Sequence, residues 1–361
     1  MSLTSYFRPP MPDLAAASMR LRRNNFDALR LIFATMVVVY HIGILSQAAS
    51  LRWLHEYVSS TFAVQAFFVV SGFLVTMSFE NSSSLKSYAA KRIRRITPAY
   101  VVVVLGAAGL LSMLSTLPAA EYFSHHDFWR YLGFNLLLSN FSAPDLPGVF
   151  QHNAERAVNG SLWTIKIEVA FYCFVPIMVW ATRRFGATRV LAILFFASLV
   201  WKVGLTTIAD ATGTPVFAKI AKQLPGQLSF FVGGAWAYNR TRDGHMPRAS
   251  WACIGVLAYA ATFGVLNDLL APAAVTAVVY WSAIAGPGLP RVGKYGDFSY
   301  GLYLYHFPIV QAFIALGFFA AAPLLSATTV FLVAIVTGIA SWFLVEHPSL
   351  QRKAVLRTAL G

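Results

Sequence analysis

The chain has 361 residues, of which 57% are hydrophobic and 12% charged, and its formal net charge is +14. Ordinary soluble domains carry about 25% charged residues, so this composition excludes such a domain and predicts an all-α protein that crosses a membrane several times. Two cysteines, each in an apolar stretch, do not define a disulfide framework.

The first predicted membrane helix holds an arginine and a histidine in the apolar run RLIFATMVVVYH. A step of eleven residues is close to three helical turns, so Arg30 and His41 share one face, about 16 Å apart along the axis. Arg30 can reach back to the lipid headgroups and pair with Asp27. His41 lies at membrane depth, where a lone neutral histidine is commonly a core residue. The arginine within the run favours a retained helix over a cleaved signal peptide.

Ten apolar segments are long enough, or nearly so, to cross the hydrocarbon core of a membrane. They are 28–46, 60–80, 96–116, 160–181, 188–206, 220–238, 251–267, 268–285, 297–319 and 324–346. Basic residues gather in alternate loops, near 8–23, 86–95, 183–189, 240–248, 291–294 and 352–357. The positive-inside rule then places both termini in the cytoplasm, and it explains the positive charge without nucleic acid as a partner.

We expect three regions: a cytoplasmic N-terminal tail at 1–23, a transmembrane domain at 24–348 and a cytoplasmic C-terminal tail at 349–361. The longest gap between spans, 117–159, is rich in aromatic residues, Pro and Gly. This composition indicates an ordered outer loop with a short interfacial or re-entrant helix near 128–139. The loop carries no motif to which we can assign a function.

Small and basic residues mark the second and third predicted spans. In FFVVSGFL, Ser71 and Gly72 are typical of close packing between helices. In KRIRRITPAY, the basic residues act first as a topology signal. Arg92 and Arg95 nevertheless share a helix face, and such a pair could bind phosphate groups through charge-assisted hydrogen bonds.

The fourth predicted span begins with NGSLWTIKIEVAFY, whose Ser161, Thr164, Glu168 and Tyr172 lie on one helix face. Lys166 points to the opposite side, so pairing within the helix does not explain both charges. The carboxylate has two interpretations at this depth. It neutralises a buried cation, or it tunes His41 or an acceptor hydroxyl.

A similar polar face recurs in the ninth predicted span, in the sequence SYGLYLYHFP. Ser299, Tyr303 and His306 share this face, and Pro308 should loosen the helix just beyond them. Because the face runs from a basic cytoplasmic loop into the span, it favours the lining of a cavity over an aromatic belt.

Motifs of soluble enzymes are absent from the sequence, including the Walker loop, HExxH, GxSxG and paired-cysteine metal sites. His125 and His126 have only Asp127 as a near carboxylate, so we predict no metal site. We also expect no tightly bound cofactor.

Six motifs in this order resemble the membrane-bound acyltransferase family 3, whose bacterial members O-acylate surface glycans and related molecules. They are FDALRLIFATMVVVYH, FFVVSGFL, RIRRITPAY, SLWTIKIEVAFY, YGLYLYHFP and VEHP, and the resemblance extends from about residue 25 to 348. Many members of that family carry an extra periplasmic esterase-like domain, which this sequence lacks. We therefore expect transfer to be completed within the membrane unit or with a separate partner.

The resemblance implies that His41 is the catalytic histidine, with Glu168 beside it in the site. It also implies that three arginines serve the acyl-CoA donor, namely Arg30, Arg92 and Arg95. We predict supporting positions at Asp27, Ser71, Ser161, Trp163, Tyr303 and His306.

The expected reaction moves an acyl group from cytoplasmic acyl-CoA, with acetyl-CoA as the expected donor, to a hydroxyl of a cell-surface or lipid-linked saccharide. An alcohol needs a base that works near neutral pH, which suits histidine. His41 either takes the proton or carries the acyl group itself. The expected partners are acyl-CoA, the saccharide acceptor and membrane lipids, and the expected location is the bacterial inner membrane. The sequence does not define the acceptor, the acyl chain or the oligomeric state.

A second class of function stays open, a proton-coupled transporter or flippase of a glycan-related or amphiphilic substrate. Buried His, Glu and Arg residues would suit such a carrier, and so would helices broken at Pro98, Pro176, Pro225 and Pro308. Against it, the hydropathy pattern contains no matched halves or inverted repeat, and the arginines gather at one face.

Overall fold

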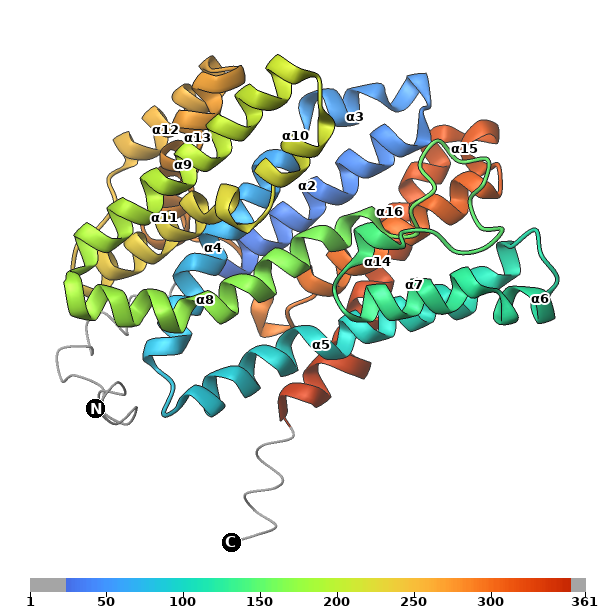
Figure 1. Cartoon of the computed structure of the whole chain (residues 1–361), viewed down its shortest axis with the longest axis horizontal. Coiled ribbons are helices and arrows are strands. Elements are labelled where there is room, and N and C mark those ends of the chain that lie inside the picture. The colour runs from blue at the N-terminus through green and yellow to red at the C-terminus, as the bar shows by residue number, and fades with distance from the viewer. Residues whose placement is uncertain (1–23, 352–361) are drawn as a thin grey trace, which may run out of the picture. The chain divides into compact units, whose positions relative to one another are not determined.

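Apolar runs of about 20 residues form helices in a membrane, because each backbone N–H and C=O must find its partner within the segment. A computed structural model describes residues 24–351, and this range consists of helices, short turns and loops, without a strand (Figure 1). The α-helices are α2 (Phe26–Ser46), α3 (Arg52–Tyr57), α4 (Ser60–Glu80), α5 (Leu85–Leu110), α6 (Ala119–Ser124), α7 (His126–Leu136), α8 (Trp163–Phe185), α9 (Ala187–Thr212), α10 (Pro215–Ala221), α11 (Leu224–Arg242), α12 (Ala249–Ala261), α13 (Gly264–Ile284), α14 (Ser299–Ala315), α15 (Phe318–Ala321) and α16 (Pro323–Ser341). A π-helical turn, Trp342–Glu346, follows α16.

Seven helices in the described part of the chain are long and apolar enough to cross a membrane: α2, α4, α5, α8, α9, α13 and α16. The other three predicted spans fall on α11, α12 and α14, which are shorter or less apolar. The protein is therefore a multi-pass helical membrane protein. The expected number of ten spans and the cytoplasmic location of both termini stay predictions.

One predicted boundary between spans is wrong. We expected the seventh and eighth spans to meet between residues 267 and 268, but α12 ends at Ala261 and α13 begins at Gly264. The backbone of Thr262 is extended, which ends the first helix. Asn267, inside α13, donates a hydrogen bond from Nδ2 to the Thr262 carbonyl (3.2 Å) and so ties the two helices together at the break.

The basic segment before the third predicted span is also helical. α5 begins at Leu85 rather than at residue 96. Ser84 precedes it, and its Oγ accepts a hydrogen bond from the Ser87 N–H (3.0 Å), which satisfies a donor of the first turn. Arg92 and Arg95 therefore lie inside a regular helix, as their shared face requires.

The predicted tails fall mainly outside the described residues, which exclude 1–23 and 352–361. At the C-terminal end, the helix continues through Gln351, three residues past the expected end of the transmembrane domain at 348. The boundaries of the tails therefore stay predictions.

The helices belong to two compact units. Unit 1 comprises residues up to 30, 64–89 and 167–291, and unit 2 comprises 31–63, 90–166 and the residues from 292 on. Unit 1 holds α9 to α13 and most of α4 and α8, and unit 2 holds α3, α6, α7, α14 to α16 and most of α2 and α5. Each unit is assembled from segments that are far apart in the sequence.

In unit 1, glycines let α4 and α11 approach along their backbones. A Cβ added at Gly72 of α4 would lie 1.9 Å from the carbonyl oxygen of Phe231, and one at Gly234 of α11 would lie 1.9 Å from that of Val69. Phe171 of α8 stacks on Phe231 with ring centroids 4.3 Å apart. The prediction of close helix packing at the SGFL segment is confirmed.

We expect Gly72→Ala to destabilise the protein by about 1–3 kcal/mol, because the new methyl group must displace a backbone carbonyl. The measurement is thermal unfolding of the purified protein in detergent. Gly106→Ala is the matched control, since nothing lies within 4 Å of a Cβ added at Gly106 in α5. Alanine there should be neutral or slightly stabilising. Equal melting temperatures for the two variants would contradict the close approach of α4 and α11.

In unit 2, small residues bring α14 and α16 together. A Cβ added at Gly301 would lie 2.9 Å from the carbonyl oxygen of Gly338, and one at Gly338 would lie 2.8 Å from the backbone nitrogen of Leu302. This contact holds the first turn of α14 against the second half of α16, near the π-helical turn.

Pro308 inside α14 leaves one backbone carbonyl without its helical partner, because proline has no N–H. That carbonyl belongs to Leu304, and the side chain of Asn159 supplies the missing donor, with Nδ2 at 2.8 Å. Oδ1 of the same asparagine accepts hydrogen bonds from the backbone N–H and Oγ of Ser161. The helix therefore continues through Pro308 to Ala315.

We expect Asn159→Ala to cost about 1–3 kcal/mol of stability, because the buried carbonyl of Leu304 loses its donor. Pro308→Ala restores a backbone N–H four residues after Leu304. In that background the same asparagine substitution should cost less, and a double-mutant cycle of melting temperatures in detergent measures the difference. An equal cost in both backgrounds would show that the asparagine acts through other contacts.

Candidate active site

Two histidines meet inside unit 2. His41 lies on α2 and His306 on α14, and Nδ1 of His41 is 3.0 Å from Nε2 of His306. The ring centroids are 5.1 Å apart, and the ring of Phe307 stands edge-on to His41. His306 is fully buried whereas His41 is half-buried. His41 is therefore the member of the pair that a ligand can reach.

Hydrogen bonds define which nitrogen of His41 is basic. Nδ1 of His306 lies 2.7 Å from the backbone carbonyl oxygen of Tyr303. A carbonyl only accepts, so this nitrogen carries the proton and Nε2 of His306 carries a lone pair. The lone pair accepts the hydrogen on Nδ1 of His41, which leaves the lone pair of His41 on its own Nε2. A base oriented in this way by a second group is the usual arrangement for proton abstraction.

Tyr303 joins α14 to the start of α8. Its hydroxyl donates to the backbone carbonyl of Ser161 (3.0 Å) and lies 2.7 Å from Oγ1 of Thr164. Ser161 is buried, and its own Oγ donates to Asn159. Trp163 follows half-buried at the first position of α8. The predicted residues of the SLW motif thus pack beside the helix that carries His306.

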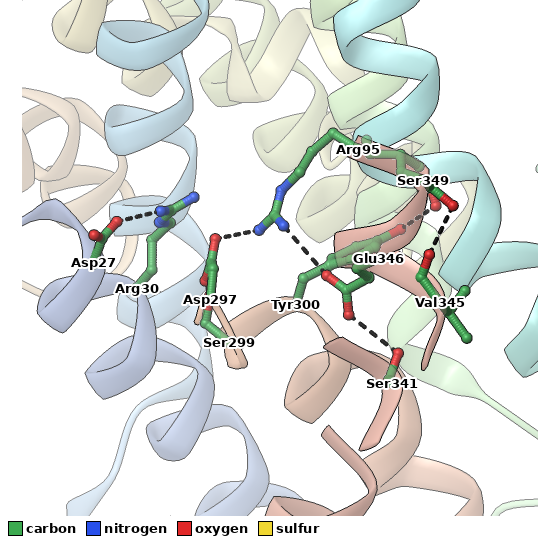
Figure 2. Close-up of polar contacts among 11 residues, drawn as sticks. Asp27, Arg30, Arg95, Asp297, Ser299, Tyr300, Ser341, Val345, Glu346 and Ser349 are labelled. Atoms are coloured by element: carbon green, nitrogen blue, oxygen red, sulfur yellow. Dashed lines mark hydrogen bonds and ion pairs between the residues drawn. The ribbon is translucent and has the colours of Figure 1, made fainter. Parts of the chain in front are cut away.

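Arg95 of α5 forms an ion-pair cluster with two carboxylates (Figure 2). Its guanidinium pairs with Asp297, just before α14, and with Oε2 of Glu346 in the π-helical turn at 3.2 Å. Glu346 is only 1% exposed and also accepts a hydrogen bond from Ser341 Oγ (3.1 Å). The ring of Tyr300 lies 5.5 Å from the guanidinium carbon. The Arg95 guanidinium, which we predicted to bind the acyl-CoA donor, is therefore paired with two carboxylates.

The other predicted arginines differ in their contacts. Arg30 pairs with Asp27 at 2.5 Å, so the pairing expected from their spacing is confirmed (Figure 2). Arg92 lies half-buried on α5, one turn before Arg95.

Glu168 and Ser71 lie in unit 1. Glu168 accepts a hydrogen bond from the hydroxyl of Tyr172, four residues later on the same helix face, at 2.5 Å. Lys166 points elsewhere, as the helical spacing predicts, with its Nζ 4.4 Å from the ring centroid of Phe141. Ser71 is buried in α4, and within residues 24–351 its Oγ has no hydrogen-bond partner.

The sequence patterns did not single out Asp297 and Glu346. The chain has only 14 acidic residues, so a carboxylate at the first position of the ninth predicted span was a detectable signal for a partner to a basic residue. Glu346 stands in the VEHP motif, to which the resemblance assigned no role. Within residues 24–351, no group of three His, Cys, Asp or Glu side chains is arranged to hold a metal ion.

These features define a class of multi-pass helical membrane protein whose candidate reactive group is a hydrogen-bonded histidine pair. The chain belongs to the acyltransferase family described as "Acyltransferase domain", whose model matches residues 23–347. The family assignment favours an acyltransferase over the transporter that the sequence left open.

Curated relatives carry related names. The chain is 31% identical to an O-acetyl transferase of Shigella phage Sf6, over 92% of this chain and 98% of the relative. It is 26% identical to the exopolysaccharide production protein ExoZ of Rhizobium meliloti, over 85% and 95%. It is 25% identical to the peptidoglycan O-acetyltransferase OatA of Listeria monocytogenes, over 79% of this chain and 49% of the relative. No solved structure matches the chain.

Proposed function

We propose that this protein moves an acyl group, expected to be acetyl, from cytoplasmic acyl-CoA to a hydroxyl of a cell-surface or lipid-linked saccharide, in the bacterial inner membrane. The observation that carries the proposal is the pair of His41 and His306, in a chain of the acyltransferase family. The names of the relatives from Rhizobium meliloti and Listeria monocytogenes support a saccharide as the acceptor.

In the proposed reaction, Nε2 of His41 removes the proton from the acceptor hydroxyl. The hydroxyl oxygen attacks the thioester carbonyl, the carbon–sulfur bond breaks, an ester forms and the proton passes to the sulfur of CoA. The hydrogen bond to His306 favours the positive charge that His41 acquires in between. The same nitrogen would act in the alternative route, in which His41 carries the acyl group. The mass of the intact enzyme, measured at neutral pH directly after mixing with acetyl-CoA, separates the two routes, because only the second adds an acetyl group to the protein.

α14 supports a path for the donor within unit 2. Its first turn lies beside the Arg95 cluster, since Tyr300 donates a hydrogen bond to the carbonyl of Ile96 on α5 (3.1 Å). His306 is six residues, or about 9 Å, further along α14. We assign Arg92, one turn before Arg95 on the same helix face, to the phosphates of the donor, as the family resemblance implies. The thioester arm would then extend along α14 towards His41.

The substitution of His306 tests its role as a positioning residue. We expect His306→Leu to lower kcat with little change in the KM for acetyl-CoA, because Nδ1 of His41 loses its acceptor. His306→Gln should retain more activity, since an amide oxygen can accept that hydrogen bond. The pH profile of kcat should shift in the leucine variant more than in the glutamine variant. Equal loss in both variants would mean that His306 acts only by filling space.

The test of the function is the release of CoA from acetyl-CoA by the purified protein in detergent. The acceptor probe is envelope polysaccharide treated with mild alkali to remove existing esters. We expect the polysaccharide to stimulate CoA release and to take up label from the acetyl group. If the folded protein releases no CoA with this probe or with longer acyl-CoAs, the proposal is wrong. Uptake of saccharide into proteoliposomes without consumption of acyl-CoA would then establish the transporter.

A further inference from the structure

The outer loop between α5 and α8 encloses a polar cavity of about 570 Å³. This volume falls in the range of small-molecule sites, which is about 300–1,000 Å³. All the residues that line it belong to unit 2. The titratable and amide side chains among them are those of His125, Asp127, Arg130, Asp145, Gln151 and Arg156.

One wall of the cavity is held in place by the loop itself. The carbonyl oxygen of Pro147 accepts a hydrogen bond from Ser115 Oγ (2.8 Å), and that of Gly148 accepts one from the Thr116 N–H (3.0 Å). Gly148 has a φ of +70°, a conformation that favours glycine. Leu146, which also lines the cavity, is buried. The cavity is therefore formed without the help of a ligand.

The charges that line the cavity balance one another. Two carboxylates, Asp127 and Asp145, are matched by the guanidinium groups of Arg130 and Arg156. Sugar hydroxyls both donate and accept hydrogen bonds, so they match a lining that offers both kinds of group. A polyanion would instead require an excess of positive charge.

The environment of Asp145 fits a ligand that donates hydrogen bonds. Partial desolvation raises the pKa of its carboxyl, the carboxylate of Glu155 acts in the same direction, and the guanidinium of Arg156 opposes them. A hydroxyl that donates to this carboxylate would offset the loss of solvation. Asp145 is thus a suitable anchor for an uncharged sugar.

The cavity is attached to the helix that carries His306. Gln311 of α14 is fully buried, and its Nε2 donates to the backbone carbonyls of Glu155 (2.7 Å) and Ala157 (2.9 Å). Arg156, which lines the cavity, stands between these two residues. Gln311 follows His306 by five residues, or about 7.5 Å along the axis.

Along α14, the contact with the Arg95 cluster and the contact with the cavity loop lie on opposite sides of His306. Tyr300, near the start of the helix, lies at the Arg95 cluster, His306 lies in the middle, and Gln311 holds the cavity loop. α5 repeats this order, with Arg95 in its first half and the cavity loop after its end. A ligand in the cavity is therefore on the opposite side of His306 from the proposed donor site.

We propose that this cavity binds the acceptor, as an uncharged saccharide unit, and presents a hydroxyl towards His41. The proposal rests on the proposed acyltransferase function. It assigns a role to the loop in which the sequence revealed no motif, and it places donor and acceptor at opposite ends of α14.

The test measures the kinetics of purified variants with acetyl-CoA and the alkali-treated polysaccharide, separated by anion exchange into neutral and acidic fractions. Asp145→Asn and Arg156→Gln should each raise the KM for the neutral fraction about tenfold or more, as expected for the loss of a hydrogen bond to a charged group. The KM for acetyl-CoA should stay at the wild-type value.

A matched control lies in the same loop outside the cavity lining. Glu121→Gln repeats the charge change of Asp145→Asn on the exposed face of α6. This control should keep the wild-type KM for the polysaccharide. Melting temperatures of all variants exclude misfolding as the cause of a raised KM.

The outcomes separate the two proposals. If the wild type acylates the neutral fraction and the cavity variants keep its KM, the cavity is not the acceptor site although the acyltransferase function stands. Acylation of the acidic fraction alone would overturn the assignment of an uncharged sugar. A failure of the wild type to acylate any fraction would refute the proposed function itself.

Discussion

Replacement of His41 by glutamine should lower the rate of acyl transfer about 10²–10⁴-fold, the usual contribution of a general acid–base group. The amide N–H of glutamine can still donate a hydrogen bond to Nε2 of His306. Glutamine has no basic nitrogen, however, so it cannot replace Nε2 of His41 as the base. The variant should therefore fold normally and lose its chemistry. Initial rates of labelled acetyl transfer, together with a melting curve in detergent, measure both properties.

His55→Gln is the matched control for this experiment. His55 of α3 is also half-buried in unit 2, and its ring stands edge-on to Tyr40, as does that of His41. It makes no contact with His306 in the described hydrogen bonds or ring contacts. We expect this control to keep its activity within about a factor of two to five, which corresponds to a change below about 1 kcal/mol in the barrier. Full activity in the His41 variant would rule out both of the proposed routes.

Removal of the charge of Arg95 should destabilise the protein by about 3–5 kcal/mol, the cost of leaving buried partners without their counter-charge. In Arg95→Gln, the carboxylate of Glu346, 1% exposed, and that of Asp297, whose side chain is 13% exposed, both lose the guanidinium. Mutual repulsion of the two carboxylates adds to the desolvation of each. The melting temperature in detergent should fall steeply in this variant.

Two further variants show whether the loss arises in the cluster. Glu346→Gln in the Arg95→Gln background removes one orphaned carboxylate, so the double variant should be more stable than the single one. Arg52→Gln breaks the exposed pair with Glu56 at i and i+4, and should change stability by at most about 0.5 kcal/mol. An unchanged melting temperature in Arg95→Gln with a raised KM for acetyl-CoA would instead assign the arginine to the donor.

The sequence predicted the helices better than their ends. Each of the ten expected spans overlaps a helix, because long apolar runs in a membrane have no other way to satisfy the backbone. The break at Thr262 was misplaced, since it lies in a mostly apolar stretch where hydropathy does not mark the end of one helix and the start of the next. The continuation of α14 past Pro308 also depends on a residue that is distant in sequence. The side chain of Asn159 donates a hydrogen bond to the carbonyl that the proline leaves without its helical partner.

The candidate site was predicted in part for a similar reason. Helical periodicity placed Tyr303 and His306 on one face, and it separated Lys166 from Glu168. Periodicity describes one helix at a time, so it did not show that His306 contacts His41 or that Asp297 and Glu346 surround Arg95. Much of the loop between α5 and α8 is irregular, so helical periodicity does not describe it, and its cavity arises from turns and from α7, which bring separate polar residues together.

Hydropathy and local spacing are properties of contiguous residues, so they were enough to predict a helical membrane protein, and the motifs pointed to the acyltransferase family. Which side chains meet followed from the tertiary structure. It made His306 the partner of His41, placed Arg95 at the centre of an ion-pair cluster, and formed a polar cavity on the loop attached to Gln311. Each of these contacts joins residues from different helices or loops. The positions of these helices and loops depend on packing between segments that are far apart in the sequence.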